Sequence, residues 1–365
     1  MRRSLAPLLI AGLLAASCSS TGTDAASGAS DPSTSSSVAA TSTDAPTDDS
    51  QPPTTTADAT TTTPATSTTA APVESNDLVD ACVVERPAEV GLQSEALESG
   101  GVEYRYQWTL PSSYDGTPLA VVLDFHPIGF SGPVQAQISR MAELAEAEGF
   151  LAVQPTGPPT STDDRNVWEL TQFDEPDRDD VAFVADLLDQ LADDICIDRD
   201  RVYAIGMSSG ALFTSNLVCR FSEHLAAAVS VAGVTHDDGC SPARAVPYLA
   251  FHGTADTTIP YDGSGQSTLE GAEAAGDFFT QVMPEEFGEF ATDFGCVDPI
   301  DTPITEKVSV RTWPECPVEL AFYTIADGGH TWPNSELFLS IDPDNTTTEL
   351  DATTIAWEFF QRHQR

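Results

Sequence analysis

Runs of residues typical of β-strands alternate with runs typical of helices along most of the chain, and this alternation limits the choice of fold more than any other feature. Alternation of this kind predicts the α/β class, a mostly parallel central sheet with helices on both faces. The nearly continuous apolar run Leu119–Leu123 is typical of a strand inside such a sheet. We expect strands at 103–110, 119–125, 151–154, 202–205, 226–231, 248–251, 308–313 and 318–325, and helices at 134–147, 181–194, 209–220, 270–283 and 351–362.

The beginning of the chain has the pattern of an export signal. Met-Arg-Arg precedes an apolar run from Leu5 to Ala16, which is about half the length that a helix needs to cross a bilayer. The run ends in Leu-Ala-Ala-Ser-Cys, which resembles the lipobox of bacterial lipoproteins, where the cysteine is lipidated. We therefore expect a lipoprotein signal at 1–17 and membrane attachment through Cys18, on the outer face of a bacterial cell membrane. The alternative is an ordinary secretory signal cleaved near Ala16.

The next segment differs in composition from everything that follows it. Residues 19–75 contain 28 Ser or Thr among 57 residues, with no aromatic side chain and no Lys or Arg. Such a segment cannot bury enough apolar surface to offset the entropy that ordering would remove. We expect residues 18–75 to be the lipidated cysteine and a disordered stalk, which holds one folded domain, residues 76–365, away from the membrane.

The chain is strongly acidic, with a formal net charge of −42. Seven of its 57 acidic residues lie in the stalk and two of its 15 basic residues lie in the signal, so residues 76–365 carry a net charge of −37. Because phosphate backbones are bound by cationic surfaces, this charge argues against nucleic acid as a partner. It also favours neutral substrates over strongly anionic polymers at low salt.

The remaining six cysteines are an even number in a chain that we expect to be exported, which predicts three disulfides. They are Cys82, Cys196, Cys219, Cys240, Cys296 and Cys316. Six cysteines allow 15 pairings, and the sequence does not choose among them. Proximity along the chain favours Cys296 with Cys316 and Cys219 with Cys240, which leaves Cys82 with Cys196. Zinc-ligand spacings are missing from the sequence, so we expect no metal and no other cofactor.

The pentapeptide Gly206-Met-Ser-Ser-Gly210 lies between an expected strand and an expected helix. This pattern is typical of a nucleophile elbow, a tight turn that exposes one serine, here Ser208. Such a serine needs a base and a carboxylate that orients the base, and in α/β-hydrolases these follow in the order Ser, Asp, His. Asp256 and His330 come in this order, each in a loop after an expected strand, where open α/β sheets build their sites. Each residue alone could be an ordinary loop residue, but the three together predict a catalytic triad.

Two further features belong to this prediction. The loop His126-Pro-Ile-Gly-Phe130 follows the strand 119–125, where backbone N–H groups that stabilise an oxyanion are expected. Since Pro127 has no N–H, we assign these donors to Ile128 and Gly129, together with Ser209 after the nucleophile. His252, at the end of the strand 248–251, is expected to support the acid loop rather than to act as the base.

Four stretches together resemble a family of secreted esterases, which includes polyhydroxybutyrate depolymerases and the feruloyl and acetylxylan esterases of carbohydrate esterase family one. The stretches are 201–210 with the elbow, 251–261 with Phe-His-Gly-Thr-Ala-Asp, 328–333 with Gly-Gly-His-Thr-Trp-Pro, and 352–360. The resemblance spans about residues 85–365 and implies an α/β-hydrolase fold. It also implies that Ser208, Asp256 and His330 are nucleophile, acid and base.

The chain departs from the family pattern at two places. His126-Pro127 stands where the family usually has His-Gly, and Ala211 stands where a second glycine is frequent. Trp168 and Trp332 fall where the family tends to keep aromatic residues near the cleft. An aromatic wall of this kind would suit a ferulate ring or the apolar face of a short polyester, and the alternative is that both are core residues.

These patterns favour an exported serine carboxylic-ester hydrolase that acts through an acyl-enzyme. Its expected substrates are feruloyl or acetyl esters of polysaccharide, or short hydroxyalkanoate polyesters, and we expect a monomer. The first alternative is a surface protein that keeps the fold and binds polysaccharide or polyester without catalysis. An intact triad argues against it, because drift after loss of activity should erase one member. A peptidase of the same superfamily is the second alternative, although no amine-binding or propeller domain is apparent in the sequence.

Overall fold

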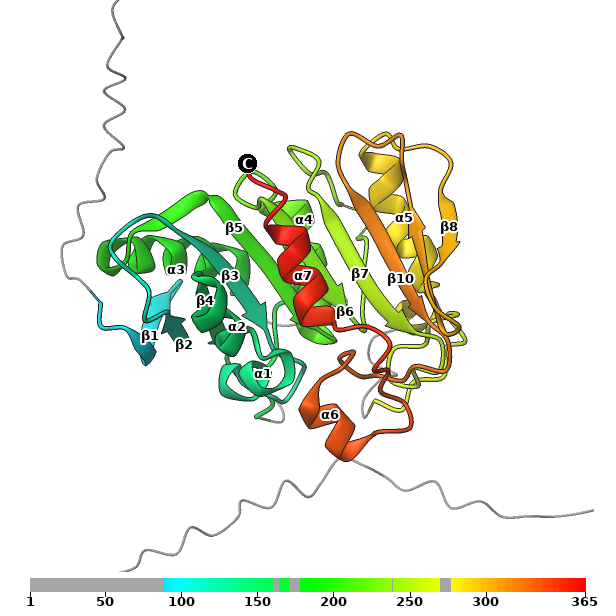
Figure 1. Ribbon diagram of the computed structural model, residues 1–365, viewed down its shortest axis with the longest axis horizontal. Coiled ribbons are helices and arrows are strands. Elements are labelled where there is room, and N and C mark those ends of the chain that lie inside the picture. Colours follow the sequence, from blue (N-terminus) through cyan, green and yellow to red (C-terminus); the bar gives the residue numbers. More distant parts are fainter. Residues whose placement is uncertain (1–87, 160–163, 171–177, 238, 270–276) are drawn as a thin grey trace, which may run out of the picture. The chain divides into compact units, whose positions relative to one another are not determined.

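The computed structural model describes residues 88–159, 164–170, 178–237, 239–269 and 277–365 (Figure 1). Within these ranges one ten-stranded sheet has the order β1-β2-β4-β3-β5-β6-β7-β10-β9-β8. The six strands from β4 to β10 in this order pair in parallel, and antiparallel strands extend the sheet at both edges. The strands are β1 Gly91–Ser99, β2 Val102–Leu110, β3 Leu119–Phe125, β4 Leu151–Thr156, β5 Ile197–Met207, β6 Ala227–Val231, β7 Tyr248–Gly253, β8 Ile300–Pro303, β9 Val308–Thr312 and β10 Leu320–Ile325.

Helices cover both faces of this sheet, as the sequence predicts. They are α1 Gly132–Ser139, α2 Met141–Glu148, α3 Asp180–Asp194, α4 Ser209–Arg220, α5 Met283–Asp293, α6 Glu336–Ile341 and α7 Ala352–Phe360. Alternate side chains of β3 divide between two buried clusters: Val121 and Leu123 pack with α3, α4 and α5, and Val122 packs with α1, α2 and α7. Figure 1 shows α7, in red, crossing in front of the central strands. Because both faces are covered, the central strands are mostly apolar.

The stretch 134–147, expected to be one helix, is two. The chain turns at Arg140, whose φ of 55° lies in the left-handed region, so α1 ends at Ser139 and α2 begins at Met141. Tertiary contacts stabilise the break, since the Arg140 guanidinium lies 3.2 Å from a carboxylate oxygen of Glu336 and 3.1 Å from one of Asp351. Both partners lie about 200 residues further along the chain, so the helical pattern of 134–147 gave no sign of the break.

Several elements were missed from the sequence. The edge strands β1 and β8 are largely exposed and polar, so they lack the apolar signal of a buried strand, and pairing with β2 and β9 holds them in place. The helix expected at 270–283 lies partly outside the described residues, and α5 begins only at Met283, where that prediction ended. The short helix α6 was also not foreseen. The signal, the stalk with Cys18, and Cys82 lie outside the described residues, so the predictions about them stay predictions.

Across the described ranges, every helix is too short or too polar to pass through a lipid bilayer.

Candidate active site

The three predicted triad residues follow three parallel strands at their carboxyl ends. Ser208 comes directly after β5, Asp256 follows β7, and His330 follows β10. In the sheet, β6 lies between β5 and β7, and β10 lies beside β7. Because the carboxyl ends of parallel strands meet at one edge of a sheet, the fold gathers these loops at that edge.

Ser208 occupies a strained turn between β5 and α4. Its φ of 55° and ψ of −121° are rare for a residue with a side chain, and its N–H donates to Val231 O at 2.9 Å. The neighbouring glycines leave the space that this turn needs. A Cβ on Gly206 would lie 2.3 Å from Gly210 O, and one on Gly210 would lie 2.2 Å from Phe125 O. The local geometry is therefore that of a nucleophile elbow.

The acid and base loops are in direct contact. His330 Nδ1 lies 2.7 Å from Asp256 Oδ2, within hydrogen-bond distance. The loops also share backbone hydrogen bonds, since Ala255 N–H donates to Gly328 O and Thr254 N–H donates to Ile325 O. The Asp256 side chain is fully buried, whereas that of His330 is 18% exposed. The histidine is therefore the member of this pair that a substrate can reach.

The buried Asp256 carboxylate is stabilised in its charged form. Its Oδ1 accepts from the N–H groups of Thr258 and Ile259 at 2.8 and 2.9 Å. Burial by itself would raise the pKa of Asp256, but the imidazoles of His330 and His252 hold that pKa well below its usual value. A charged Asp256 at neutral pH is what orients a base and stabilises its protonated form.

Ser208 and the loop of Asp256 both border Gly233, the residue shortly after β6. A Cβ added to Gly233 would lie 3.1 Å from Ser208 O and 3.3 Å from Ile259 Cδ1. Among the hydrogen bonds of the described residues, none joins Ser208 to His330. Catalytic hydrogen bonds are often long in the free enzyme and shorten only when substrate binds.

The expected oxyanion loop needs one correction. The N–H of Gly129 donates to Asn166 O at 2.7 Å, so it is not free to bind an oxyanion. The side chain of Asn166 in turn donates to Phe130 O at 2.7 Å and fixes the loop from a second side. Within the described residues we find no acceptor for the N–H of Ile128 or of Ser209, and these two remain the candidate donors. Asn166 was missed from the sequence, because nothing in its neighbourhood marks it as a loop clamp.

His126 also holds this loop. Its Nδ1 donates to Pro127 O at 2.7 Å and its Nε2 accepts from the Gly157 N–H at 3.0 Å. Burial lowers the pKa of His126 to about 4, so the ring is neutral at neutral pH. Its role is to shape the loop, since it is fully buried and cannot reach a substrate.

Neither predicted substrate-binding tryptophan lines a cleft. Trp168 and Trp332 are both 0% exposed, so the structure gives them packing roles in place of contact with substrate. Trp168 stacks on Phe213 and donates from Nε1 to His126 O at 3.0 Å. Trp332 donates from Nε1 to Thr353 Oγ1 at 3.0 Å, which anchors the loop of His330 to the start of α7. The physical reason for the correction is that both indole N–H groups find partners in the core.

Two of the predicted disulfides are confirmed. Cys219 is bonded to Cys240, and Cys296 is bonded to Cys316. The pairing of Cys196 with Cys82 stays a prediction, because Cys82 lies outside the described residues.

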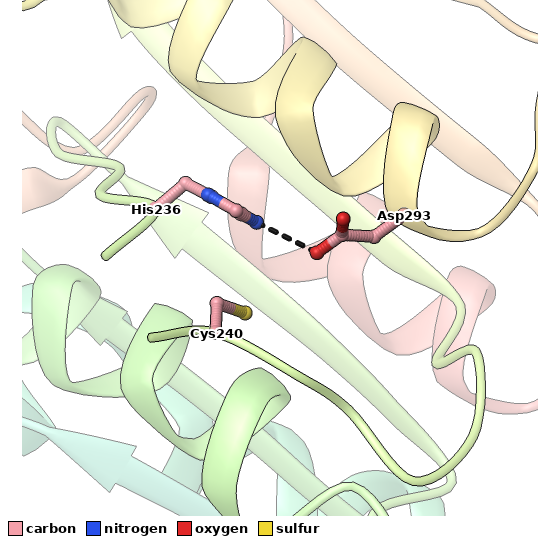
Figure 2. A group of neighbouring side chains, drawn as sticks. All are labelled: His236, Cys240 and Asp293. Carbon is pink, nitrogen blue, oxygen red and sulfur yellow. Dashed lines mark hydrogen bonds and ion pairs between the residues drawn. The ribbon is translucent and has the colours of Figure 1, made fainter. Parts of the chain in front are cut away.

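One group of side chains has the composition of a metal site. Figure 2 shows His236, Cys240 and Asp293 facing one another, with His236 Nε2 lying 2.8 Å from Asp293 Oδ2. The Cys240 sulfur is already bonded to Cys219, so it cannot offer a thiolate while the disulfide is intact. The two remaining side chains are already hydrogen-bonded to each other, and this group is better described as a His–Asp hydrogen bond beside a disulfide.

A serine in a strained elbow and a bonded Asp–His pair, at the carboxyl edge of a mainly parallel sheet, define an α/β-hydrolase. No family model matches the chain. Feruloyl esterase B from Piromyces equi is 27% identical over 229 residues, which are 60% of this chain and 41% of that protein. The putative esterase NocK from Nocardia uniformis subsp. tsuyamanensis is 28% identical over 287 residues, which are 72% of this chain and 77% of that protein.

This chain is thus related to esterases of the α/β-hydrolase fold, and it spans less than half the length of the first of these relatives. Among solved structures, an acetyl xylan esterase from Aspergillus awamori is 15% identical with a TM-score of 0.48, covering 68% of this chain and 98% of that one. This structural likeness is too distant to bear on the activity.

Proposed function

We propose that the chain is an exported serine carboxylic-ester hydrolase in which Ser208, Asp256 and His330 are nucleophile, acid and base. The observation that carries the proposal is the 2.7 Å contact between His330 Nδ1 and the charged, buried Asp256, at the same sheet edge as the elbow serine. Because Nδ1 of His330 is bonded to Asp256, Nε2 is the ring nitrogen that remains to take up a proton. The names of the related esterases support the same reaction class.

Acylation is the first half of the proposed reaction. Ser208 Oγ attacks the ester carbonyl carbon while His330 Nε2 takes the hydroxyl proton, and Asp256 stabilises the imidazolium that forms. The carbonyl oxygen becomes an oxyanion, which the N–H groups of Ile128 and Ser209 stabilise, a contribution of about 3–4 kcal/mol per donor. Collapse breaks the bond to the alcohol oxygen, which takes the proton from His330 and leaves.

Deacylation repeats the same steps with water. His330 takes a proton from the water, whose oxygen attacks the acyl carbon of the ester on Ser208. The second tetrahedral intermediate collapses by breaking the bond to Oγ, which recovers the proton. The products are a carboxylic acid and the free enzyme.

The test is the hydrolysis of p-nitrophenyl acetate and p-nitrophenyl butyrate by the full chain. We expect turnover that Ser208→Ala abolishes and that Ser113→Ala, at an exposed serine away from the site, leaves unchanged. A fluorophosphonate probe should label the wild-type chain and the Ser113→Ala variant but not the Ser208→Ala variant. Equal turnover by the wild-type chain and Ser208→Ala, without labelling, would leave the non-catalytic binder as the better description.

The proposed substrates are neutral esters, namely feruloyl or acetyl groups on polysaccharide, with hydroxyalkanoate oligomers as the second choice. The net charge of −37 on residues 76–365 repels anionic polymers at low salt. Methyl ferulate, acetylated xylan and 3-hydroxybutyrate oligomers, assayed side by side, distinguish these substrates. A higher kcat/KM on the hydroxybutyrate oligomers would overturn the preference for polysaccharide esters.

We also propose attachment to the outer face of the cell membrane through Cys18. The two disulfides support a place outside the cell, because such bonds persist in oxidising compartments. Cells that express the chain should incorporate labelled palmitate into it, and Cys18→Ser should remove the label and release the protein. A wild-type chain found only in the medium and without label would favour the ordinary secretory signal.

A further inference from the structure

His252 is a buried histidine that the proposed reaction does not use. It lies at the end of β7, four residues before Asp256, and its side chain is 0% exposed. Its Nε2 lies 2.9 Å from Ile259 O and 3.4 Å from Asp256 Oδ2. The same carboxylate oxygen accepts from His330 at 2.7 Å, so two imidazoles face one oxygen of the acid.

The contacts determine which nitrogen of His252 carries the proton. A carbonyl oxygen and a carboxylate oxygen can only accept, so Nε2 must be the donor. Nδ1 is buried and has no partner among the described residues. A proton on Nδ1 would therefore be a buried donor without an acceptor, which disfavours the imidazolium. His252 thus donates from Nε2, and its contacts provide no acceptor for a proton on Nδ1.

This ring closes a set of hydrogen bonds around the acid. Asp256 Oδ1 accepts from the N–H groups of Thr258 and Ile259, and the carbonyl of Ile259 accepts from His252. The carboxylate is therefore held on both oxygens, by its own loop on one side and by imidazoles on the other. Without His252, the Ile259 carbonyl would be buried without a donor and the loop could rotate.

We propose that His252 is a positioning residue for the hydrolase, an imidazole whose Nε2–H fixes Asp256 Oδ2 toward His330 and limits how strongly the acid holds the protonated base. Its partial positive N–H faces the oxygen that pairs with His330. It cannot touch the substrate, because its side chain is fully buried. The inference rests on the proposed function only for its kinetic readout.

The other charged groups near this pair are few in the described part of the chain. The ring of Tyr261 lies 5.9 Å from that of His252, and its hydroxyl bonds to Thr324 on β10. The exposed pair Lys307–Asp327 lies beyond Thr254, whose hydroxyl accepts from the Asp327 N–H. These exposed charges are screened by solvent, which weakens their effect on Asp256 and the two histidines.

The kinetic test compares His252→Leu with His252→Gln in the full chain, using p-nitrophenyl acetate. Leu removes the donor, whereas the Gln amide nitrogen reaches about as far as Nε2. With Leu we expect kcat to fall about tenfold with KM nearly unchanged, and the acid-side midpoint of the pH profile of kcat/KM to rise by about half to one pH unit. The rise follows because an acid with one donor fewer holds the protonated His330 more tightly. With Gln, both values should stay near those of the wild-type chain.

A purely structural role would lower activity without moving the midpoint, and that result, or unchanged kinetics in the Leu variant, would overturn the proposal.

The wild-type chain provides a second measurement if the Leu variant does not fold. Nitrogen NMR should show His252 with its proton on Nε2 and with Nδ1 unprotonated. A His252 ring with its proton on Nδ1 would also overturn the proposal. Absence of Ser208-dependent turnover in the wild-type chain would instead refute the proposed function. The NMR measurement would still test the position of the proton on His252.

Discussion

The β3 side and the β7 side of the site each hold a buried aspartate, and the pKa values of the two carboxyl groups are shifted in opposite directions. Asp124 on β3 accepts from Gln135 Nε2 and Ser139 Oγ, both at 2.6 Å, and has neutral donors only. Burial raises the pKa of Asp124 to about 7 despite these hydrogen bonds. Asp256 after β7 is equally buried, but two imidazoles and two backbone N–H groups hold its pKa below the usual value.

The difference teaches that the partners, and not the degree of burial, decide in which direction the pKa of a buried carboxyl group moves. The fully ionised carboxylate at neutral pH is therefore that of Asp256, on the β7 side, where the proposed acid and base lie. The β3 side offers an approaching oxyanion only neutral backbone N–H groups. A substrate whose carbonyl lies between the two sides would meet a base on one side and hydrogen-bond donors on the other.

The largest expected effect comes from neutralising the two aspartates in turn. Asp256→Asn removes the charge that orients His330 and stabilises its protonated form, so kcat should fall by about 10³–10⁴-fold. Asp124→Asn should leave kcat within about threefold, because its carboxyl group contacts neither the triad nor the candidate oxyanion donors. Steady-state kinetics on p-nitrophenyl acetate measures both. Similar losses in the two variants would contradict the assignment of charge to one side.

Replacing a closely packed glycine by alanine on either side should have the next largest effect, in this case on stability. A Cβ on Gly210 would lie 2.2 Å from Phe125 O on the β3 side, and a Cβ on Gly253 would lie 2.2 Å from Gly328 O on the β7 side. We expect Gly210→Ala and Gly253→Ala each to lower the free energy of unfolding by about 3–5 kcal/mol. Gly288→Ala, in α5 with no atom near the added Cβ, should stabilise by up to about 1 kcal/mol. Urea denaturation compares the three, and equal stabilities would refute the close backbone contacts.

The two aspartates should also give opposite dependences of stability on pH. Because the pKa of Asp124 is raised on folding, the folded chain binds more protons than the unfolded chain between about pH 4 and 7, and the Asp124 contribution to stability is lost as pH rises. The lowered pKa of Asp256 gives a contribution that is present above about pH 4 and is lost as pH falls toward that lower pKa.

Relative to the wild-type chain, Asp124→Asn should therefore gain roughly 2–3 kcal/mol in free energy of unfolding between pH 5 and pH 8. Urea denaturation at the two pH values measures the gain. A difference between variant and wild type that does not change with pH would mean that Asp124 is charged in the folded chain.

The smallest expected effect concerns the path that joins the two sides. Trp332, beside His330, donates to Thr353, whose hydroxyl donates to Ser139 O, and the hydroxyl of Ser139 donates to Asp124. Trp332→Phe removes the first of these bonds and should cost about 1 kcal/mol of stability and about threefold in kcat. Trp357→Phe, which loses a bond to Glu148 away from the site, should cost similar stability without lowering kcat. Equal kcat in both variants would show that the path does not position His330.

Much of the architecture could be predicted because its signals are local. The apolar run Leu119–Leu123 indicated a central strand, and the elbow glycines indicated a turn that only glycine permits at those positions. The gathering of Ser208, Asp256 and His330, each after a parallel strand, follows from how parallel strands end at one edge. The two confirmed disulfides join cysteines 20 and 21 residues apart, so proximity along the chain was enough to suggest them.

The remaining features depend on contacts between distant segments. The break at Arg140 forms with Glu336 and Asp351, and the N–H of Gly129 is taken by Asn166, which no pattern near residue 129 reveals. The burial of Trp168 and Trp332 likewise depends on what packs around them, because an indole ring suits a core and a cleft equally well.

By itself the sequence determined an α/β sheet, the residues at the carboxyl ends of its strands and the net charge of the chain, since periodicity, turn chemistry and composition are local properties. Only the tertiary structure decided in which direction the pKa of each buried carboxyl group moves, which N–H groups of the described residues remain unpaired and which histidine of the Asp–His cluster is exposed. These are properties of the environment around a group, and distant parts of the chain supply that environment when they pack together.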